Sequence, residues 1–338
     1  MSMKVSTSPY MTGGSVQAQQ TRDALMTKYD MPRSVTSALD KLAKMQVVLC
    51  IDDSYSMDQY VMSSHPGDVR KFRCEECYHH VQVIGEVAAI YDQTGVDCYF
   101  LNKGAESRLP YFSLVPEHSS LLVSNTHPHC CTVYSERLKQ AILQAAGDTP
   151  LVATLRKIVD LWKSYLQEGE LALFCLTDGR DSRNESLSQW ICEVMQDSQI
   201  RKHLHLTFVT ITDEENVQRY FHEEIDQVVL EGVEDQPQID VVGSFITEQE
   251  ECKQRNPTLS FSSGMYFAKM LCGSIDKEVD HIDECIIEVH EDGSIVTHKE
   301  KEDAMFARLT QTETPAAVSR EAEQASKAVH TGCSCVIA

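Results

Sequence analysis

The chain has 338 residues, which gives room for one large α/β domain with extensions or for two modest domains. A hydrophobic fraction of 42% argues against wholesale disorder, and a formal net charge of −21, with no Lys/Arg cluster to offset it, argues against nucleic acid as a partner. The 13 cysteines are odd in number and several lie in apolar runs, as at Cys50, Cys98 and Cys175, which favours buried thiols in a reducing compartment over a disulfide scaffold.

Residues 1–44 are expected to form an N-terminal arm and a short helix. Residues 1–20 lack the charged-then-apolar pattern of a secretory signal, and no apolar run reaches the roughly eighteen residues that span a bilayer. We therefore expect a protein made in the cytosol that does not cross a membrane. Residues 1–33 are polar, as in a flexible arm, and Val35, Leu39 and Leu42 then recur at helical spacing.

Residues 45–245 alternate between apolar runs and helical stripes. The run 47–51 has strand length and ends at two aspartates, as expected for a strand buried on both faces. A helical stripe over 69–91 and a strand over 96–101 follow, which together make a parallel crossover unit. Residues 102–131 are less regular, with one weak strand signal at 121–123.

The second half of this region continues the alternation. Helices are predicted at 134–145 and 151–162, and the loop between them holds Asp148 and Thr149. Apolar strands at 171–176 and 204–211 flank a helix at 187–194. The pattern predicts an α/β fold with a doubly wound, mostly parallel open sheet flanked by helices, in which ligands bind outside the carboxyl ends of the strands.

The remaining residues change character after Gly243. Residues 246–309 are expected to form a small α+β extension that packs on the sheet domain, with a helix at 261–271 and a hairpin of 286–289 with 295–297. Residues 310–338 have linker composition and are expected to form a flexible tail.

Polar side chains follow three of the predicted elements. Asp52, Ser54 and Ser56 form an Asp-x-Ser-x-Ser sequence after the first strand, Thr149 lies between two helices, and Asp178 follows the strand at 171–176. A hard cation such as Mg²⁺ prefers six oxygen ligands, and hydroxyls with one or two carboxylates leave it seeking a further anionic ligand. A helix-capping turn would explain residues 52–56 alone. The three segments together favour a metal site.

These segments resemble the metal-ion-dependent adhesion site of von Willebrand factor type A (VWA) domains in their order and approximate spacing. The resemblance implies that Ser54, Ser56 and Thr149 coordinate Mg²⁺, Mn²⁺ or Ca²⁺, and that Asp52 and Asp178 bind the ion directly or through water. A partner's Asp or Glu would complete its shell. On this basis Asp178→Ala is expected to abolish partner binding and to leave the fold largely intact.

The resemblance covers about residues 45–245 of the chain. Residues 91–92 and 95–102 are also similar to a segment of intracellular fungal and protist members of the family. Tyr55 stands where many members have glycine, so we expect a stiffer loop and a partly covered metal mouth.

The chain ends in Cys335-Val336-Ile337-Ala338, which matches a prenylation signal that permits farnesyl transfer to Cys335. One prenyl chain gives marginal membrane residence, and Cys333 is the candidate for a second, palmitoyl anchor. We therefore expect a cytoplasmic protein held on the cytosolic face of a membrane. Its negative charge should keep the domain away from anionic headgroups and leave the metal site free.

Two rival interpretations remain open. One is a zinc-dependent enzyme or module, although the spacing is not that of a known zinc family. Its ligands would come from two clusters: Cys74, Cys77, His79 and His80, with His127, His129, Cys130 and Cys131. The sequence lacks nucleophile and phosphate-loop motifs, so it favours a non-enzymatic binding module, with zinc less favoured than an oxygen-ligated ion. The other rival is a bacterial effector that is prenylated by a host.

Overall fold

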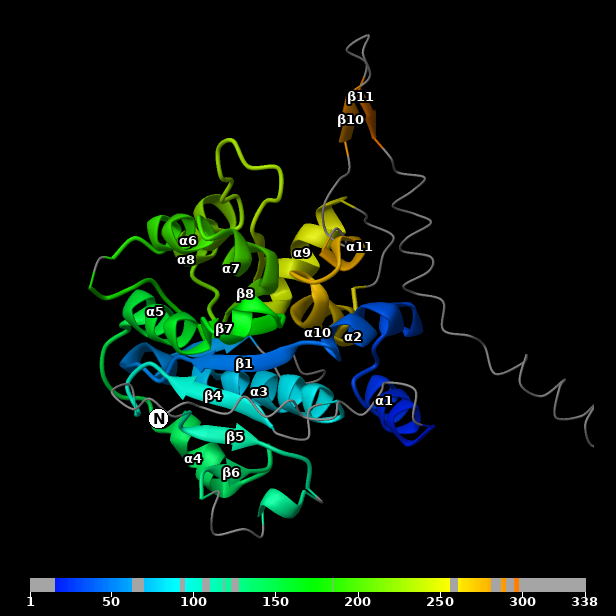
Figure 1. Ribbon diagram of the computed structural model, residues 1–338, viewed down its shortest axis with the longest axis vertical. Coiled ribbons are helices and arrows are strands. Elements are labelled where there is room, and N and C mark those ends of the chain that lie inside the picture. The colour runs from blue at the N-terminus through cyan, green and yellow to red at the C-terminus, as the bar shows by residue number, and fades with distance from the viewer. Residues whose placement is uncertain are drawn as a thin grey trace, which may run out of the picture.

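The computed structural model describes residues 16–62, 70–91, 95–104, 110–117, 119–122, 128–183, 185–255, 261–280, 287–289 and 295–297. Its centre is a seven-stranded sheet with helices on both faces (Figure 1). The predicted doubly wound, mostly parallel α/β sheet is therefore confirmed.

The strand order places the first strand in the middle of the sheet. The order is β6-β5-β4-β1-β7-β8-β9, and every neighbouring pair is parallel except β4 with β5. The bounds are β1 (Gln46–Ile51), β4 (Val96–Phe100), β5 (Phe112–Leu114), β6 (Cys130–Cys131), β7 (Leu171–Thr177), β8 (Leu204–Thr210) and β9 (Gln238–Val242). The chain runs from β1 to β4 on one side and later returns to β7 on the other. The carboxyl ends of β1 and β7 therefore flank a switch in strand order, where open α/β sheets bind ligands.

Two hydrophobic clusters hold the helices to the sheet. Val47, Leu49 and Ile51 face one cluster, and Val48 and Cys50 face the other, because successive side chains of a strand point to opposite faces. The first cluster takes in α1 (Val16–Lys28), α2 (Thr36–Leu42), α3 (Arg73–Ala89), α4 (Glu136–Leu143), α9 (Phe245–Arg255), α10 (Ser263–Cys272) and α11 (Lys277–Asp280). The second takes in α5 (Leu151–Trp162), α6 (Leu187–Met195), α7 (Ser198–His203) and α8 (Glu215–Tyr220). This burial on both faces explains why the sequences of the central strands are continuous apolar runs.

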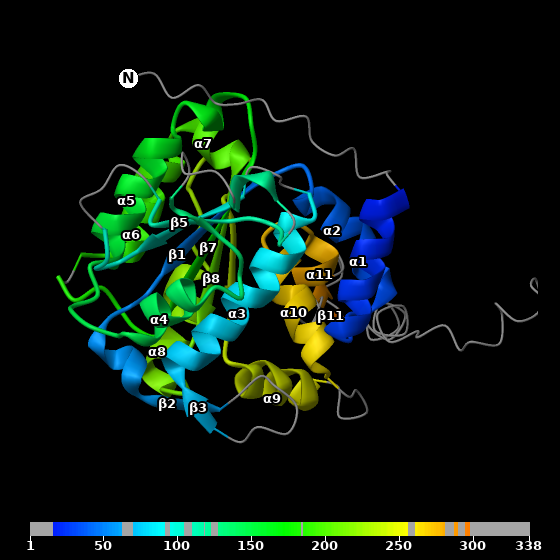
Figure 2. The same ribbon diagram turned by 90° about the horizontal axis from the view of Figure 1, so that it is seen from below.

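A small hairpin separates β1 from the long helix α3. Strands β2 (Tyr60–Met62) and β3 (Arg70–Phe72) are antiparallel and lie beside the N-terminal end of α3 (Figure 2). The predicted helix over 69–91 therefore begins late, at Arg73. The Glu75 carboxylate accepts a hydrogen bond from the Phe72 backbone N–H at 3.1 Å, which caps the helix at this point.

Other differences from the predicted elements lie at the edges of the fold. Helix α1 occupies part of the predicted arm, where Met26 is buried against the first cluster. Residues 120–122 form a 3-10 turn, η3 (Ser120–Leu122), and not the strand signalled at 121–123. The predictions omitted β5, β6 and β9, because these strands are short or carry polar residues such as Asp240, so pairing with their neighbours decides their structure.

The C-terminal extension contains the predicted helix and hairpin. Helix α10 is buried, and β10 (Ile287–Val289) pairs antiparallel with β11 (Ile295–Thr297). Helices of the extension pack on the sheet, whereas Figure 1 shows the hairpin standing apart from it. The predicted tail and lipid signal lie outside the described residues.

Within the described residues, all ten cysteines are free thiols, and eight of them are buried, which agrees with the expectation of buried thiols. No helix in the described part of the chain has both the length and the apolar character needed to cross a bilayer.

Candidate metal site

The parallel register of β1 and β7 brings Asp52 and Asp178 to the same edge of the sheet. Ile51 lies opposite Leu176, and the Asp52 N–H donates to the Leu176 carbonyl at 2.9 Å, which extends the ladder by one bond. The Thr177 hydroxyl then donates to Asp52 Oδ2 at 2.6 Å. The end of β7 therefore positions a carboxylate on the loop after β1, across 125 positions of sequence.

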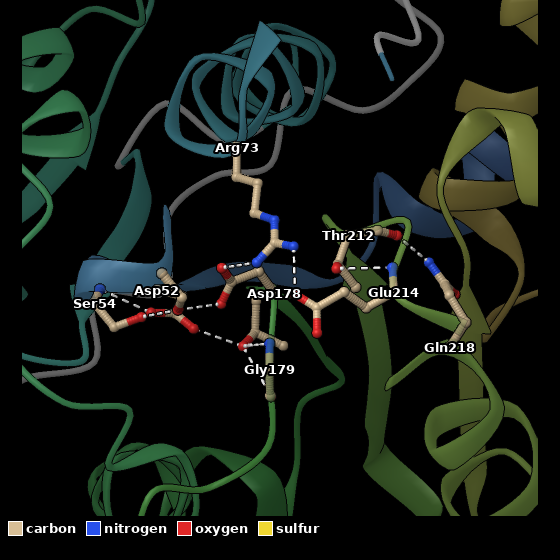
Figure 3. Close-up of polar contacts among 10 residues, drawn as sticks. Asp52, Ser54, Arg73, Asp178, Gly179, Thr212, Glu214 and Gln218 are labelled. Atoms are coloured by element: carbon tan, nitrogen blue, oxygen red, sulfur yellow. Dashed lines mark hydrogen bonds and ion pairs between the residues drawn. The ribbon is translucent and has the colours of Figure 1, made fainter. Parts of the chain in front are cut away.

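A continuous chain of polar contacts joins four of the five predicted ligands (Figure 3). Ser56 Oγ donates to Asp178 Oδ1 at 2.8 Å and lies 3.0 Å from Ser54 Oγ. The Ser54 N–H donates to Asp52 Oδ1 at 2.9 Å, and Asp52, Ser54 and Asp178 lie together at this edge of the sheet. Two carboxylates and two hydroxyls drawn from different strand ends thus converge, as the sequence predicts.

The fifth predicted residue, Thr149, lies on a loop that is bound to the others through its backbone. The Tyr55 N–H donates to the Gly147 carbonyl at 3.1 Å. The Thr149 carbonyl accepts from the Ser182 N–H at 2.9 Å, and the Thr149 N–H donates to the Ser182 hydroxyl at 3.1 Å. Gly147 has a φ of +94°, and a Cβ there would approach Asn102 Oδ1 to 2.5 Å, so only glycine fits. The loop holds Thr149, a buried residue, beside the serine loop.

Tyr55 lies between the two serines of the loop. Its side chain is 69% exposed and therefore stands in solvent rather than packing into the loop.

Asp53 is a structural member of the site that sequence reasoning did not select. It is fully buried and accepts hydrogen bonds from the backbone N–H groups of Asn102 at 2.8 Å and Lys103 at 3.2 Å, and from both of their side chains at 3.1 and 2.9 Å. Its own carbonyl accepts from the Ala146 N–H at 2.6 Å. Asp53 thus ties the loops after β1, β4 and α4 together. Its position directly after Asp52, where side chains alternate in direction, was the available signal.

Arg73 is a second residue that sequence reasoning missed. From the first turn of α3 its guanidinium reaches Asp178, with Nη1 donating to Oδ2 at 2.8 Å (Figure 3). Nη2 donates to Glu214 Oε1 at 2.7 Å, and Glu214 lies on the loop after β8. A contact that spans 105 positions leaves no local pattern for Arg73. For Glu214, the acidic residues that follow the strand at 204–211 were an available signal that the sequence analysis did not use.

Burial and mutual repulsion shift the titration of the two aspartates. Burial, and then the neighbouring Asp178 charge, raise the pKa of Asp52 to about 6. Burial also raises the pKa of Asp178, although Arg73 opposes the shift. The raised pKa of Asp52 therefore costs stability that is absent below its ordinary pKa of 3.8, grows as the pH rises from there, and is complete above about pH 6. A bound cation would favour the ionised form, so its affinity would fall below the same pH.

These oxygen donors suit a hard divalent ion. Carboxylate and hydroxyl oxygens are ligands of Mg²⁺, Mn²⁺ and Ca²⁺, whereas zinc sites rely on cysteine and histidine. In the part of the chain that is described, no group of three or more His, Cys, Asp and Glu side chains is placed to hold a metal ion. A site here would therefore depend on the serine and threonine hydroxyls as well as on the two carboxylates.

Among the described residues of the rival zinc clusters, no three side chains are placed to hold a metal ion. Cys74 and Cys77 are buried on α3, where burial raises the pKa of Cys74 to about 11 and that of Cys77 well above its usual value. Without a metal these thiols therefore stay protonated at neutral pH. His127 lies outside the described residues.

Comparison of the chain with protein-family models and with curated proteins gave no match. The site geometry and the local resemblance therefore carry the functional argument.

Proposed function

We propose that this chain is a non-enzymatic, VWA-type protein-binding module that holds a divalent cation at its serine loop and captures an acidic side chain of a partner protein. The supporting observation is the chain of contacts from Asp178 through Ser56 and Ser54 to Asp52. These four side chains would hold Mg²⁺ or Mn²⁺, with Thr149 on the adjacent loop. The ion would supply the positive charge that the partner's carboxylate meets.

The position of the site supports a binding role. Ser54 follows β1 and Asp178 follows β7, at the switch in strand order where this architecture presents ligand sites. Tyr55 stands exposed at the rim and would meet a partner that reaches the serine loop.

The ligand hydroxyls provide the direct test of this proposal. The double variant Ser54→Ala/Ser56→Ala is expected to weaken Mn²⁺ binding, measured by calorimetry, by at least about tenfold, because two oxygen donors are lost. Partners recovered with the wild-type chain in Mn²⁺ should disappear in excess chelator and with this variant.

Ser186 and Ser188 offer a matched control, because their hydroxyls form an exposed serine pair 3.1 Å apart and neither is a predicted ligand. Replacing both with alanine removes the α6 cap and should leave Mn²⁺ affinity unchanged. Recovery of the same partners in Mn²⁺ and in chelator would reject the metal-dependent mechanism.

We also propose that the chain is tethered to the cytosolic face of a membrane through prenylated Cys335, with Cys333 as a second acylation site. The support is the terminal sequence, which matches a prenylation signal. Cys335→Ser is expected to move the protein from the membrane fraction to the soluble fraction of a eukaryotic cell, because both lipid signals depend on this cysteine. Cys333→Ser should give a partial shift. An unchanged membrane fraction for Cys335→Ser would contradict the tether.

A further inference from the structure

A buried arginine already occupies one oxygen of the central carboxylate of the candidate site. Arg73 and Asp178 form an ion pair at 2.8 Å, with side-chain exposures of 4% and 0%. Water is therefore excluded from the pair, and its electrostatic interaction is poorly screened.

The two oxygens of Asp178 have different partners. Oδ1 accepts from Ser56 on the side of the predicted ligands, and Oδ2 accepts from Arg73 on the side of α3. The guanidinium also contacts Glu214, whose side chain is 47% exposed. The two Nη atoms of Arg73 therefore bridge the carboxylates of Asp178 and Glu214. A divalent ion at the serines would have to share Asp178 with a cation that is already in place.

The charges of the site define the consequence of this sharing. Asp52, Asp178 and Glu214 carry three negative charges when ionised, and Arg73 carries one positive charge. The two negative charges that remain would be neutralised by a divalent ion. Without Arg73 the loaded site would stay negative and would repel a partner's carboxylate. The arginine therefore acts in two ways, because it opposes the ion and favours an acidic ligand once the ion is bound.

We propose that Arg73 is an internal cation that competes with the divalent ion for Asp178 and thereby sets the ion affinity of the site. Glu214 keeps the guanidinium in place when Asp178 binds the ion. This inference rests on the proposed metal-binding function. It assigns Arg73 and Glu214 as positioning residues that tune the site.

Mn²⁺ titration of the full chain by calorimetry tests the inference, with circular dichroism to confirm folding. Arg73→Gln is expected to bind Mn²⁺ about tenfold more tightly than the wild type, because the competing charge is gone. Arg73→Lys keeps the charge and should stay near the wild type. Arg180→Gln is the matched control: Arg180 is an exposed arginine close to Asp178 in sequence that bonds to the Asn216 carbonyl, and its loss should leave the affinity unchanged.

A second pair of variants covers the case in which Arg73→Gln does not fold. In Glu214→Gln, Asp178 is the remaining carboxylate that pairs with Arg73. The arginine should then compete more strongly with the ion, so Mn²⁺ binding is expected to weaken. The effect should exceed that of Asp213→Asn, which removes the charge of a neighbouring exposed residue. The Asp213 carboxylate accepts a hydrogen bond from the Met62 N–H and not from Arg73.

The outcomes separate the two proposals. Absence of Mn²⁺ binding by the wild type and by every variant would overturn the proposed function and the inference with it. If the wild type binds Mn²⁺ but Arg73→Gln is unchanged or weaker, the function stands and competition by Arg73 is wrong. Equal effects of Glu214→Gln and Asp213→Asn would likewise reject the role of Glu214.

Discussion

Asp178→Ala is expected to lower the free energy of unfolding by about 3 kcal/mol, because it leaves the buried Arg73 guanidinium without its fully buried partner. Glu214 remains, but its carboxylate is half exposed and contacts only one end of the guanidinium. Urea unfolding of the wild type and the variant would measure the difference. This expectation differs from the one that the sequence alone supports, in which the substitution leaves the fold largely intact.

The double variant Asp178→Ala/Arg73→Met is the control for this mechanism. Removing both charges should restore most of the lost stability, because a buried ion pair contributes less than the penalty for breaking it. If the double variant is as unstable as the single one, the loss has another cause. Because the single variant is expected to be unstable, its loss of partner binding would not separate ion loss from unfolding, whereas the serine variants would.

The central sheet could be predicted from sequence because its strands are buried on both faces. The runs at 47–51, 171–176 and 204–211 are apolar throughout, and each matches a strand to within about one residue. Asp52 and Asp178 could be placed together for the same reason, since the carboxyl ends of adjacent parallel strands share one edge.

The parts that could not be predicted depend on contacts between distant residues. Arg73 pairs with Asp178 over 105 positions and with Glu214 over 141, so no periodicity or spacing marks it. Strands β5 and β6 have three and two residues, too few to show an alternation, and form because each finds a partner edge. The sequence pattern thus identifies the predicted oxygen ligands, whereas the arginine beside them follows from the fold.

Asp53→Ala is expected to lower the free energy of unfolding by about 3 kcal/mol, because buried donors lose their acceptor. The Asn102 and Lys103 N–H groups would have no partner in place of the carboxylate, and the Lys103 ammonium would keep only the Gln144 carbonyl at 2.7 Å. The loops after β1 and β4 would then separate. Urea unfolding measures the stability change.

The same substitution should weaken Mn²⁺ binding by about tenfold, because Asp53 positions the loop that carries Ser54 without contacting the predicted ligands through its own carboxylate. Asp58→Ala, which removes an exposed aspartate of the same loop, should change neither stability nor affinity appreciably. Asp53→Asn keeps the volume and one acceptor oxygen, so it should fall between the two. If Asp53→Ala lost stability but bound Mn²⁺ as tightly as the wild type, the loops would not need this tie to assemble the ligands, and the arrangement of the serines would have to be set by β1 and β7 alone.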